Sequence, residues 1–159
     1  MNDLLKMKLS VILKALLLEK NIMKYFSTAN SSSNNSAAIK IKDTEVAFGI
    51  TPETATSLPN PAELFLGSFC ACVLKNVERF SHLMNFTYSN AEIKVDATRS
   101  DKPPKMEEIH YELTIFSDDE SLNIPLLKKN IEKFGTIYNT AKASCIIIGE
   151  IKRIENKSE

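Results

Sequence analysis

A largely apolar run in the middle of the chain predicts a long helix from about residue 61 to Met84. Asn60 can cap its start, Pro61 suits the first helical position, and the carboxylate of Glu63 can return to the N–H of the cap residue. The first half of this segment is apolar almost all round, and polar residues return only from Lys75 onward. The pattern therefore predicts a central helix whose first half is buried on every side.

Shorter patterns on both sides of this helix predict strands. Ile39 and Ile41, followed by Val46 and Phe48, alternate with polar residues and indicate one or two opening strands. The residues 49–61 are rich in proline and threonine, which favours a loop before the helix.

The second half of the chain predicts a hairpin and then a second helix. Residues 91–98 and 109–116 alternate apolar with polar positions, which is typical of two antiparallel strands. The turn-forming residues 99–105 between them predict a loop longer than a tight turn. Acidic and capping residues at 118–121 predict the start of a second helix, which ends near Phe134.

Residues 139–144 are small and polar, and residues 145–154 are rich in isoleucine. This pattern fits either a short helix that leads into a strand or a final strand alone. The complete order is strands, helix, strands, helix and strand. This order predicts the α+β class, with an antiparallel sheet wrapped around a long buried central helix.

The N-terminal part of the chain differs from the rest. Residues 1–24 interleave lysines with leucines and isoleucines as in a basic amphipathic helix, and residues 29–38 are rich in serine and asparagine, as in a flexible linker. We therefore expect an extension with a linker over residues 1–38 and one domain over residues 39–159. Charges recur too often for a membrane span, and no secretory cleavage site follows.

Three interpretations of the extension stay open. Residues 1–28 resemble a mitochondrial presequence, although arginine is absent and acidic residues intrude. The segment is also compatible with an extra helix, or with upstream translation if Met23 is the true start. We expect a cytoplasmic protein, or a mitochondrial one if residues 1–28 act as a presequence.

The composition indicates an ordinary globular domain. The chain has 159 residues, of which 43% are hydrophobic and 25% charged. Because the formal net charge is zero, no global field attracts nucleic acid or anionic lipid, and we expect neither as a partner. The cysteines number three, which is odd and too few for a secreted disulfide framework, so free thiols in a reducing compartment are expected.

The cysteines are the candidates for chemistry. Cys70 and Cys72 are two positions apart in the predicted helix, which turns their side chains about 200° away from each other. This spacing disfavours a metal site, and His82 and His110 are isolated in the sequence. Redox chemistry needs only one ionised thiol and a second thiol that can reach it after oxidation. Cys72 and Cys145 are candidates for this pair, although Cys72 alone is also compatible with a small buried packing residue.

A motif in the central helix resembles the Pro-x-Glu-Leu…Cys helix of the OsmC/Ohr family, the osmotically inducible protein C-like and organic hydroperoxide resistance proteins. The hairpin over residues 92–116 and the C-terminal Cys145 are also similar, and the likeness extends over roughly residues 39–154. The residues that carry the motif are Pro61, Glu63, Leu64, Phe65, Leu66, Gly67, Ser68 and Cys72.

The resemblance implies a fold, an assembly and an activity. It implies an intertwined homodimer whose central helices pack in its core, with each active site at the subunit boundary. It implies a peroxiredoxin-like thiol peroxidase in which Cys72 reduces a hydroperoxide, organic or hydrogen peroxide, and becomes a sulfenic acid that condenses with Cys145. A dithiol reductant, lipoyl-type or another thiol, then restores both cysteines, and no cofactor is implied.

Two departures place the chain in a divergent branch of this family. The family's peroxidases carry an arginine in the N-terminal strand and loop region, whereas the arginines here are Arg79, Arg99 and Arg153. The catalytic glutamate of the family directly follows the helix-starting proline, where this chain has Ala62, with Glu63 one step later.

Glu63 is therefore a candidate both for catalysis and for helix capping. Lys40 and Lys42 are candidates for the missing cation, although solvated lysines are common on strand edges. The departures favour an alternative function, a non-enzymatic OsmC-like dimer that binds a hydrophobic small molecule or senses oxidation.

Overall fold

The computed structural model describes residues 23–156. They divide into two compact units, one that ends at Thr54 and one that begins at Ala55. The basic amphipathic segment predicted over residues 1–24 lies outside the described residues except for its last two. Within residues 23–156, no helix is both long enough and apolar enough to cross a membrane.

The first unit contains a three-stranded antiparallel sheet. Its strands are β1 (Thr28–Ser31), β2 (Ala37–Ile41) and β3 (Thr44–Ala47), in the order β1-β2-β3. Strands β2 and β3 are the two opening strands that the alternating pattern predicts. Strand β1 lies in the serine- and asparagine-rich segment for which a flexible linker is expected. It has no apolar periodicity to reveal it, because its order comes from backbone pairing with β2.

The second unit begins with a loop and the helix α2 (Pro61–Met84), whose bounds agree with the prediction. The side chain of Asn60 accepts hydrogen bonds from the backbone N–H of Ala62 at 2.8 Å and of Glu63 at 3.0 Å. The Glu63 carboxylate in turn accepts from the N–H of Asn60 at 2.8 Å. The predicted capping box is therefore present.

The hairpin is longer than the sequence indicates. Strands β4 (Asn90–Asp101) and β5 (Pro104–Phe116) pair antiparallel to their ends, with a register shift between Thr98 and Arg99. Only Lys102 and Pro103 lie between the paired ends, so the prediction of a longer loop is wrong. Pro104 is tolerated because it is the first residue of its strand, where a missing N–H does little harm.

The C-terminal third follows one of the two open alternatives, a short helix before a strand. It consists of α3 (Ile124–Phe134), α4 (Thr136–Lys142) and β6 (Ile146–Ile154). Strand β6 runs parallel to β5, so the sheet β4-β5-β6 is mixed and the expectation of a purely antiparallel sheet is wrong. The reason is that α3 and α4 return the chain to the end of the sheet from which β5 starts.

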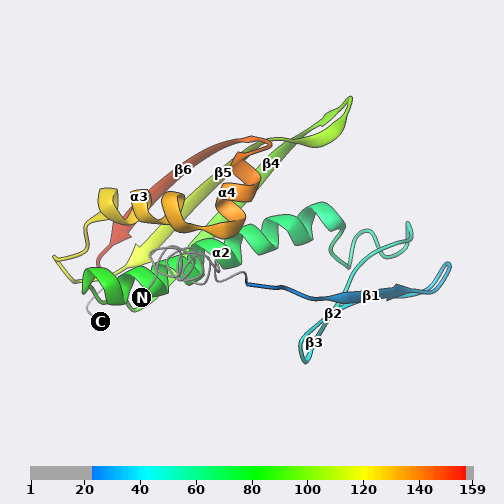
Figure 1. The fold of residues 1–159 in the computed structure, drawn as a ribbon, viewed down its shortest axis with the longest axis horizontal. Coiled ribbons are helices and arrows are strands. Elements are labelled where there is room, and N and C mark those ends of the chain that lie inside the picture. The colour runs from blue at the N-terminus through cyan, green and yellow to red at the C-terminus, as the bar shows by residue number, and fades with distance from the viewer. Residues whose placement is uncertain (1–22, 157–159) are drawn as a thin grey trace, which may run out of the picture. The chain divides into compact units, whose positions relative to one another are not determined.

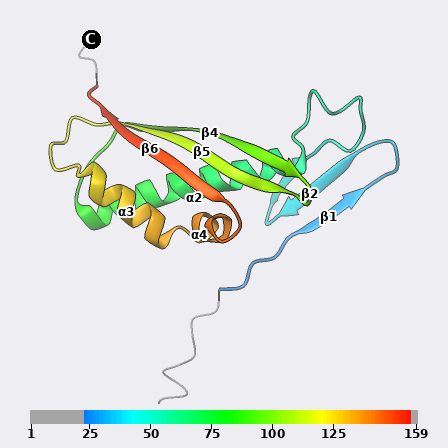
Figure 2. The same cartoon turned by 90° about the horizontal axis from the view of Figure 1, so that it is seen from above.

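One face of this sheet carries the helices. Figures 1 and 2 show α2, α3 and α4 together on the same face of β4, β5 and β6. Alternate residues of β5 point into the core, among them Ile109, Tyr111, Leu113 and Ile115. The predicted α+β class with a long central helix is confirmed.

Helix α2 buries one face rather than its whole circumference. Phe69 and Val73 are fully buried, whereas Gly67, Ser68 and Ala71 in the first half of the helix are exposed. The prediction that the first half is buried on every side is therefore not met within one chain. The reason is that the partners of α2 in this unit, the sheet and the two shorter helices, all lie on its one buried face.

Phe69, Tyr111 and Tyr138 form an aromatic cluster in the core of the second unit. The centroid of the Phe69 ring lies 5.8 Å from that of Tyr111 and 5.8 Å from that of Tyr138. Tyr111 stands opposite Gly149 in the β5–β6 register, and a Cβ on that glycine would lie 1.8 Å from Cε1 of the ring. The tyrosine ring thus fills the space that any other side chain at Gly149 would need.

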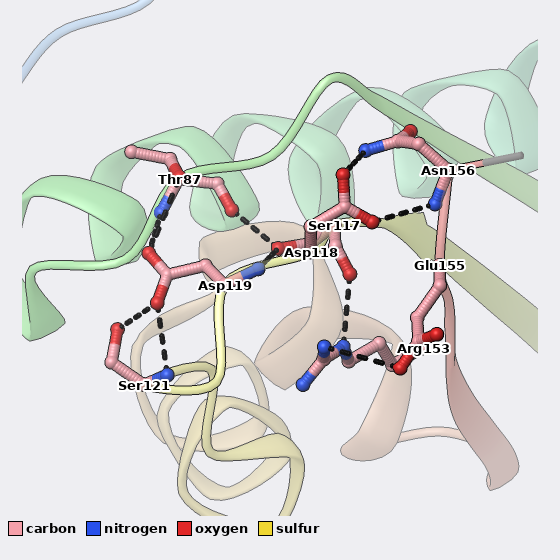
Figure 3. Close-up of polar contacts among 8 residues, drawn as sticks. All are labelled: Thr87, Ser117, Asp118, Asp119, Ser121, Arg153, Glu155 and Asn156. Carbon is pink, nitrogen blue, oxygen red and sulfur yellow. Dashed lines mark hydrogen bonds and ion pairs between the residues drawn. The ribbon is translucent and has the colours of Figure 1, made fainter. Parts of the chain in front are cut away.

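A polar knot joins the ends of the strands (Figure 3). Asp119 accepts hydrogen bonds from the backbone N–H of Thr87 at 2.8 Å and of Ser121 at 2.9 Å, and from the Ser121 hydroxyl at 2.6 Å. These donors lower the pKa of Asp119 to about 2. The residues of the knot are Thr87, Ser117, Asp118, Asp119, Ser121 and Asn156.

The polar knot explains why α3 starts later, at Ile124, than the acidic residues at 118–121 predict. Asp118 accepts from the backbone N–H and the side-chain amide of Asn156, both at 2.8 Å. The acidic residues are therefore used to hold the C-terminal segment and the α2–β4 loop. The cap of α3 is Asn123, whose side chain accepts from the N–H of Leu126 at 2.9 Å.

Candidate functional site

Cys72 lies on α2 in the face that turns toward the junction of α3 and α4. Its side chain is half-buried, and its Sγ is 3.5 Å from the position that a Cβ on Gly135 would occupy. Gly135 is the residue between α3 and α4, and a Cβ there would also lie 2.9 Å from the Ile131 carbonyl oxygen. The absence of a side chain at Gly135 thus lets this junction approach the sulfur closely.

Asn76 is the polar neighbour of this thiol. It lies one helical turn after Cys72, and only 7% of its surface is exposed. Its Nδ2 donates to the carbonyl oxygen of Cys72 at 2.8 Å and lies 3.8 Å from Sγ of the same residue. The sulfur of Cys72 therefore accepts a weak hydrogen bond from a neutral amide. The sequence offered one signal for Asn76, a polar residue at i+4 from the cysteine.

Cys145 has the opposite hydrogen-bond role. It lies after the last residue of α4 and immediately before β6, and it is half-buried against the core. Its thiol donates to the carbonyl oxygen of Ala141 at 3.2 Å.

The structure places the two sulfurs of the predicted pair near opposite ends of α4. Cys72 Sγ lies 3.5 Å from the position of a Cβ on Gly135, and Cys145 Sγ lies 3.2 Å from the carbonyl oxygen of Ala141. The helix axis advances about 9 Å from Gly135 to Ala141. All three cysteines are free thiols, so Cys72 and Cys145 are not bonded to each other.

Glu63 does not reach Cys72 within one chain. Both its ends are engaged in the capping box at the start of α2, and it is exposed. Cys72 lies nine positions after Glu63, which corresponds to about 13.5 Å along the helix axis. In this chain Glu63 has the capping role that the sequence left open beside the catalytic one.

The arginines are engaged elsewhere. Arg79 stacks over two phenylalanine rings, Arg99 pairs with Asp101 at 3.5 Å, and Arg153 donates to a backbone carbonyl at 2.9 Å. Within the described part of the chain none of them contacts Cys72. The cation candidates Lys40 and Lys42 lie in the first unit, in β2 and in the turn after it.

A polar cleft of about 600 Å³ opens beside Cys145. It is formed where β4, β5, α4 and β6 meet. Its walls carry both charge signs and include a cysteine, and its lining residues are Thr98, Lys105, Glu107, Glu108, Lys142, Ser144, Cys145 and Ile146. A second reactant can therefore approach Cys145 from solvent.

The remaining candidates are Cys70, His82 and His110, and each has surroundings that fit a structural role. Burial raises the pKa of the Cys70 thiol above its ordinary value, which disfavours the reactive thiolate. His82 is on the surface of α2, where its Nε2 lies 3.0 Å from the Glu78 carboxylate. His110 is on the outer face of β5 and contacts Asp96 at 3.3 Å.

The fold and the site define an α+β protein that carries a half-buried thiol on its central helix and a second thiol before its last strand. The family model of OsmC-like proteins matches residues 54–149, which is more than half of the chain. The chain therefore belongs to the OsmC-like protein family. This confirms the resemblance drawn from the helix motif.

Solved structures support the same fold. An OsmC-like protein from Mycoplasma pneumoniae superposes with a TM-score of 0.75 at 18% identity, covering 83% of this chain and 98% of that one. An organic hydroperoxide resistance protein OsmC from Legionella pneumophila gives a TM-score of 0.62 at 12% identity, with 84% and 100% covered. The organic hydroperoxide resistance protein OhrB of Bacillus subtilis gives 0.54 at 16% identity, with 82% and 98% covered. No curated protein matches the chain.

Proposed function

We propose that this protein is a thiol-dependent peroxidase that reduces organic hydroperoxides, with Cys72 as the attacking thiol and Cys145 as the resolving one. The observation that carries the proposal is the difference between the two sulfurs. The sulfur of Cys72 accepts a hydrogen bond from the amide of Asn76, whereas the thiol of Cys145 donates one to a backbone carbonyl. Family membership and the names of two similar structures support the choice of a hydroperoxide as substrate.

The reaction conserves atoms and electrons in three steps. The thiolate of Cys72 attacks one peroxide oxygen, the O–O bond breaks, and the alkoxide leaves as an alcohol after taking a proton. Cys72 is then a sulfenic acid, and the thiol of Cys145 displaces its hydroxyl as water to form a disulfide. An external dithiol reduces this disulfide by exchange and becomes oxidised itself. The cleft beside Cys145 supports access of that dithiol to the resolving sulfur.

The proposal requires that the two sulfurs come into bonding contact, since they lie near opposite ends of α4 and are free thiols in the structure. The segment between α4 and β6 is the candidate, because Cys145 lies there and contacts α4 through two hydrogen bonds to the Ala141 carbonyl. Oxidation is expected to break them as Cys145 moves toward Cys72.

The test is consumption of cumene hydroperoxide by the purified full chain with dihydrolipoamide as the reductant. Cys72→Ser is expected to reduce consumption to the rate without protein, and Cys145→Ser to slow turnover while one equivalent of peroxide is still consumed. Cys70→Ser is the matched control, with turnover unchanged. Full turnover by Cys72→Ser would refute the assignment.

We further propose that the active form is a homodimer. Helix α2 leaves part of its surface uncovered in one chain, and β6 is an edge strand with Ile146 and Ile148 more than half exposed. Light scattering coupled to size exclusion measures the mass directly. A mass of 17.8 kDa at the concentrations used for turnover would contradict a dimer.

The positions of the arginines and of Glu63 favour a second function. None of these groups contacts Cys72 within the described part of one chain, and the sulfurs are not in bonding distance. A non-enzymatic OsmC-like dimer that senses oxidation or binds a hydrophobic small molecule needs no such groups. Formation of a Cys72–Cys145 disulfide on treatment with peroxide, without turnover in the presence of dithiol, would favour this sensor.

A further inference from the structure

Asn76 is an unusual residue for its place in the fold. It lies in α2 among apolar neighbours and is more than nine-tenths buried. The two other buried polar residues among those described, Ser81 and Ser117, bind backbone carbonyls at 2.7 Å and 2.6 Å. Asn76 differs from them because one of its contacts goes to a sulfur that can react.

The orientation of the Asn76 amide follows from its hydrogen bond to the backbone. Its Nδ2 donates to the carbonyl oxygen of Cys72 at 2.8 Å. If the amide were reversed, its own oxygen would face that carbonyl oxygen, and two acceptors would repel each other. The backbone therefore keeps the nitrogen, which has a second hydrogen, on the side of Cys72 Sγ at 3.8 Å.

A donor in this position favours the anionic form of the sulfur. A thiolate only accepts hydrogen bonds, and a buried N–H that points to it stabilises the negative charge. No arginine of the described chain contacts Cys72, because Arg79, Arg99 and Arg153 have other partners. The amide of Asn76 is thus the side-chain donor that the structure places at the sulfur of Cys72.

We propose that Asn76 is the positioning residue that holds the Cys72 sulfur and activates it as a thiolate, so that Cys72 rather than Cys70 or Cys145 reacts first with an electrophile. This inference rests on the proposed function in that it names a residue needed for the first step. It is nevertheless a statement about thiol reactivity, which is measurable whether or not the protein turns over peroxide.

Two substitutions separate the two contacts of the amide. Asn76→Leu keeps a similar volume and removes both donors. Asn76→Ser keeps one hydroxyl donor, which at this position bonds to the carbonyl oxygen four residues earlier, and leaves no hydrogen for the sulfur. Both are expected to lower the rate constant for alkylation of Cys72 at pH 7 by about three- to tenfold, as expected for one hydrogen bond.

The experiment uses the full chain with Cys70→Ser and Cys145→Ser, so that only Cys72 reacts. Iodoacetamide alkylation is measured from pH 5 to pH 10, and both Asn76 variants are expected to shift the profile to higher pH while the rate at its alkaline plateau stays similar. Ser81→Ala is the matched control, since it removes a buried α2 donor to a backbone carbonyl that does not contact a thiol. Its profile is expected to coincide with that of the parent.

The outcomes for the two proposals are distinct. If both Asn76 variants keep the parent profile, the role of Asn76 is refuted, even if the parent consumes peroxide. If the profile shifts as expected while the chain with all three cysteines does not turn over peroxide, the peroxidase proposal fails and the role of Asn76 stands. Should Asn76→Leu not fold, as judged by circular dichroism, Asn76→Ser alone decides, because it retains the backbone hydrogen bond.

Discussion

The polar knot at the C-terminal end of β6 and the aromatic cluster beside the thiol helix are stabilised in different ways. In the knot, Asp118 and Asp119 each accept several hydrogen bonds in partly hydrated surroundings (Figure 3). In the cluster the contacts are between aromatic rings, and the buried hydroxyl of Tyr111 has no hydrogen-bond partner among residues 23–156. The comparison teaches that the knot depends on charge and donors, whereas the cluster depends on volume.

The largest effect is expected from a methyl group placed in the aromatic cluster. In Gly149→Ala the new Cβ would lie 1.8 Å from a ring carbon of Tyr111, so the ring or the strand must move. We expect the free energy of unfolding to fall by about 3 kcal/mol, at the upper end for overpacking. Urea denaturation measures the change.

Gly67→Ala is the matched control for that substitution. Gly67 is exposed in the interior of α2, and nothing lies within 4 Å of a Cβ built on it. Alanine there is expected to raise stability by about 0.5–1 kcal/mol, since it restricts the unfolded chain and favours the helix. If both glycine substitutions had the same effect, the volume argument for the cluster would be wrong.

A smaller effect is expected at the glycine that lies next to Cys72. In Gly135→Ala the Cβ would lie 2.9 Å from both the Ile131 carbonyl oxygen and Cβ of Tyr138, and 3.5 Å from the thiol sulfur. We expect a loss of about 1–2 kcal/mol of unfolding free energy and a changed alkylation rate of Cys72, because the α3–α4 junction must move away. An unchanged urea midpoint together with an unchanged rate would contradict this contact.

The polar knot is expected to respond to pH rather than to volume. Side-chain and backbone donors lower the pKa of Asp119 from 3.8 to about 2. A depressed pKa in the folded state contributes stability above the unfolded value near 4, and this contribution is lost as the pH falls toward 2. Solvent screens this exposed group, so we expect Asp119→Asn to be modestly destabilised at pH 7 and to approach the parent protein near pH 2.

Thermal unfolding followed by circular dichroism between pH 2 and pH 7 tests the prediction for Asp119. Glu120→Gln is the control, since the neighbouring Glu120 is an exposed carboxylate outside the set of residues that form the knot. A difference between Asp119→Asn and the parent that is the same at every pH would argue against a role of the charge.

A small increase in the free energy of unfolding is expected for Tyr111→Phe. The hydroxyl of Tyr111 is buried, and no described residue forms a hydrogen bond with it, so its removal relieves a desolvation cost and is expected to raise stability by up to about 1 kcal/mol. Tyr138→Phe is the paired variant. Burial and the Glu132 carboxylate raise the pKa of Tyr138 to about 12, and loss of its hydrogen bond is expected to lower stability. If Tyr111→Phe were the less stable of the two, the hydroxyl of Tyr111 would have a partner.

Much of the fold was predictable where a local signal and the tertiary structure agree. The cap at Asn60, the proline at position 61 and the end of α2 at Met84 follow from the sequence because helix ends depend on nearby residues. The start of α3 was not, because Asp118 and Asp119 have the composition of a helix start and are instead bound by residues distant in the chain.

The candidate site was predictable to a smaller extent. The motif around Cys72 led to the family, and the matching family model confirms that step. The distance between Cys72 and Cys145 depends on how α4 is placed, which their separation along the chain does not reveal. The i+4 spacing already allows Asn76 to contact the sulfur of Cys72. The importance of this contact becomes visible only in the structure, where Asn76 is buried and Cys72 is half-buried.

The sequence by itself determined the α+β class, the central helix with its capping box, the absence of a net charge and the family motif that ends at Cys72. These properties depend on residue type, on periodicity and on contacts within one turn. Only the tertiary structure decided the parallel pairing of β6, the narrow space over Gly149, the partners of the acidic residues and the separation of the two thiols. The physical reason is that these features arise from segments distant in the chain, whose approach depends on the packing of whole helices and strands.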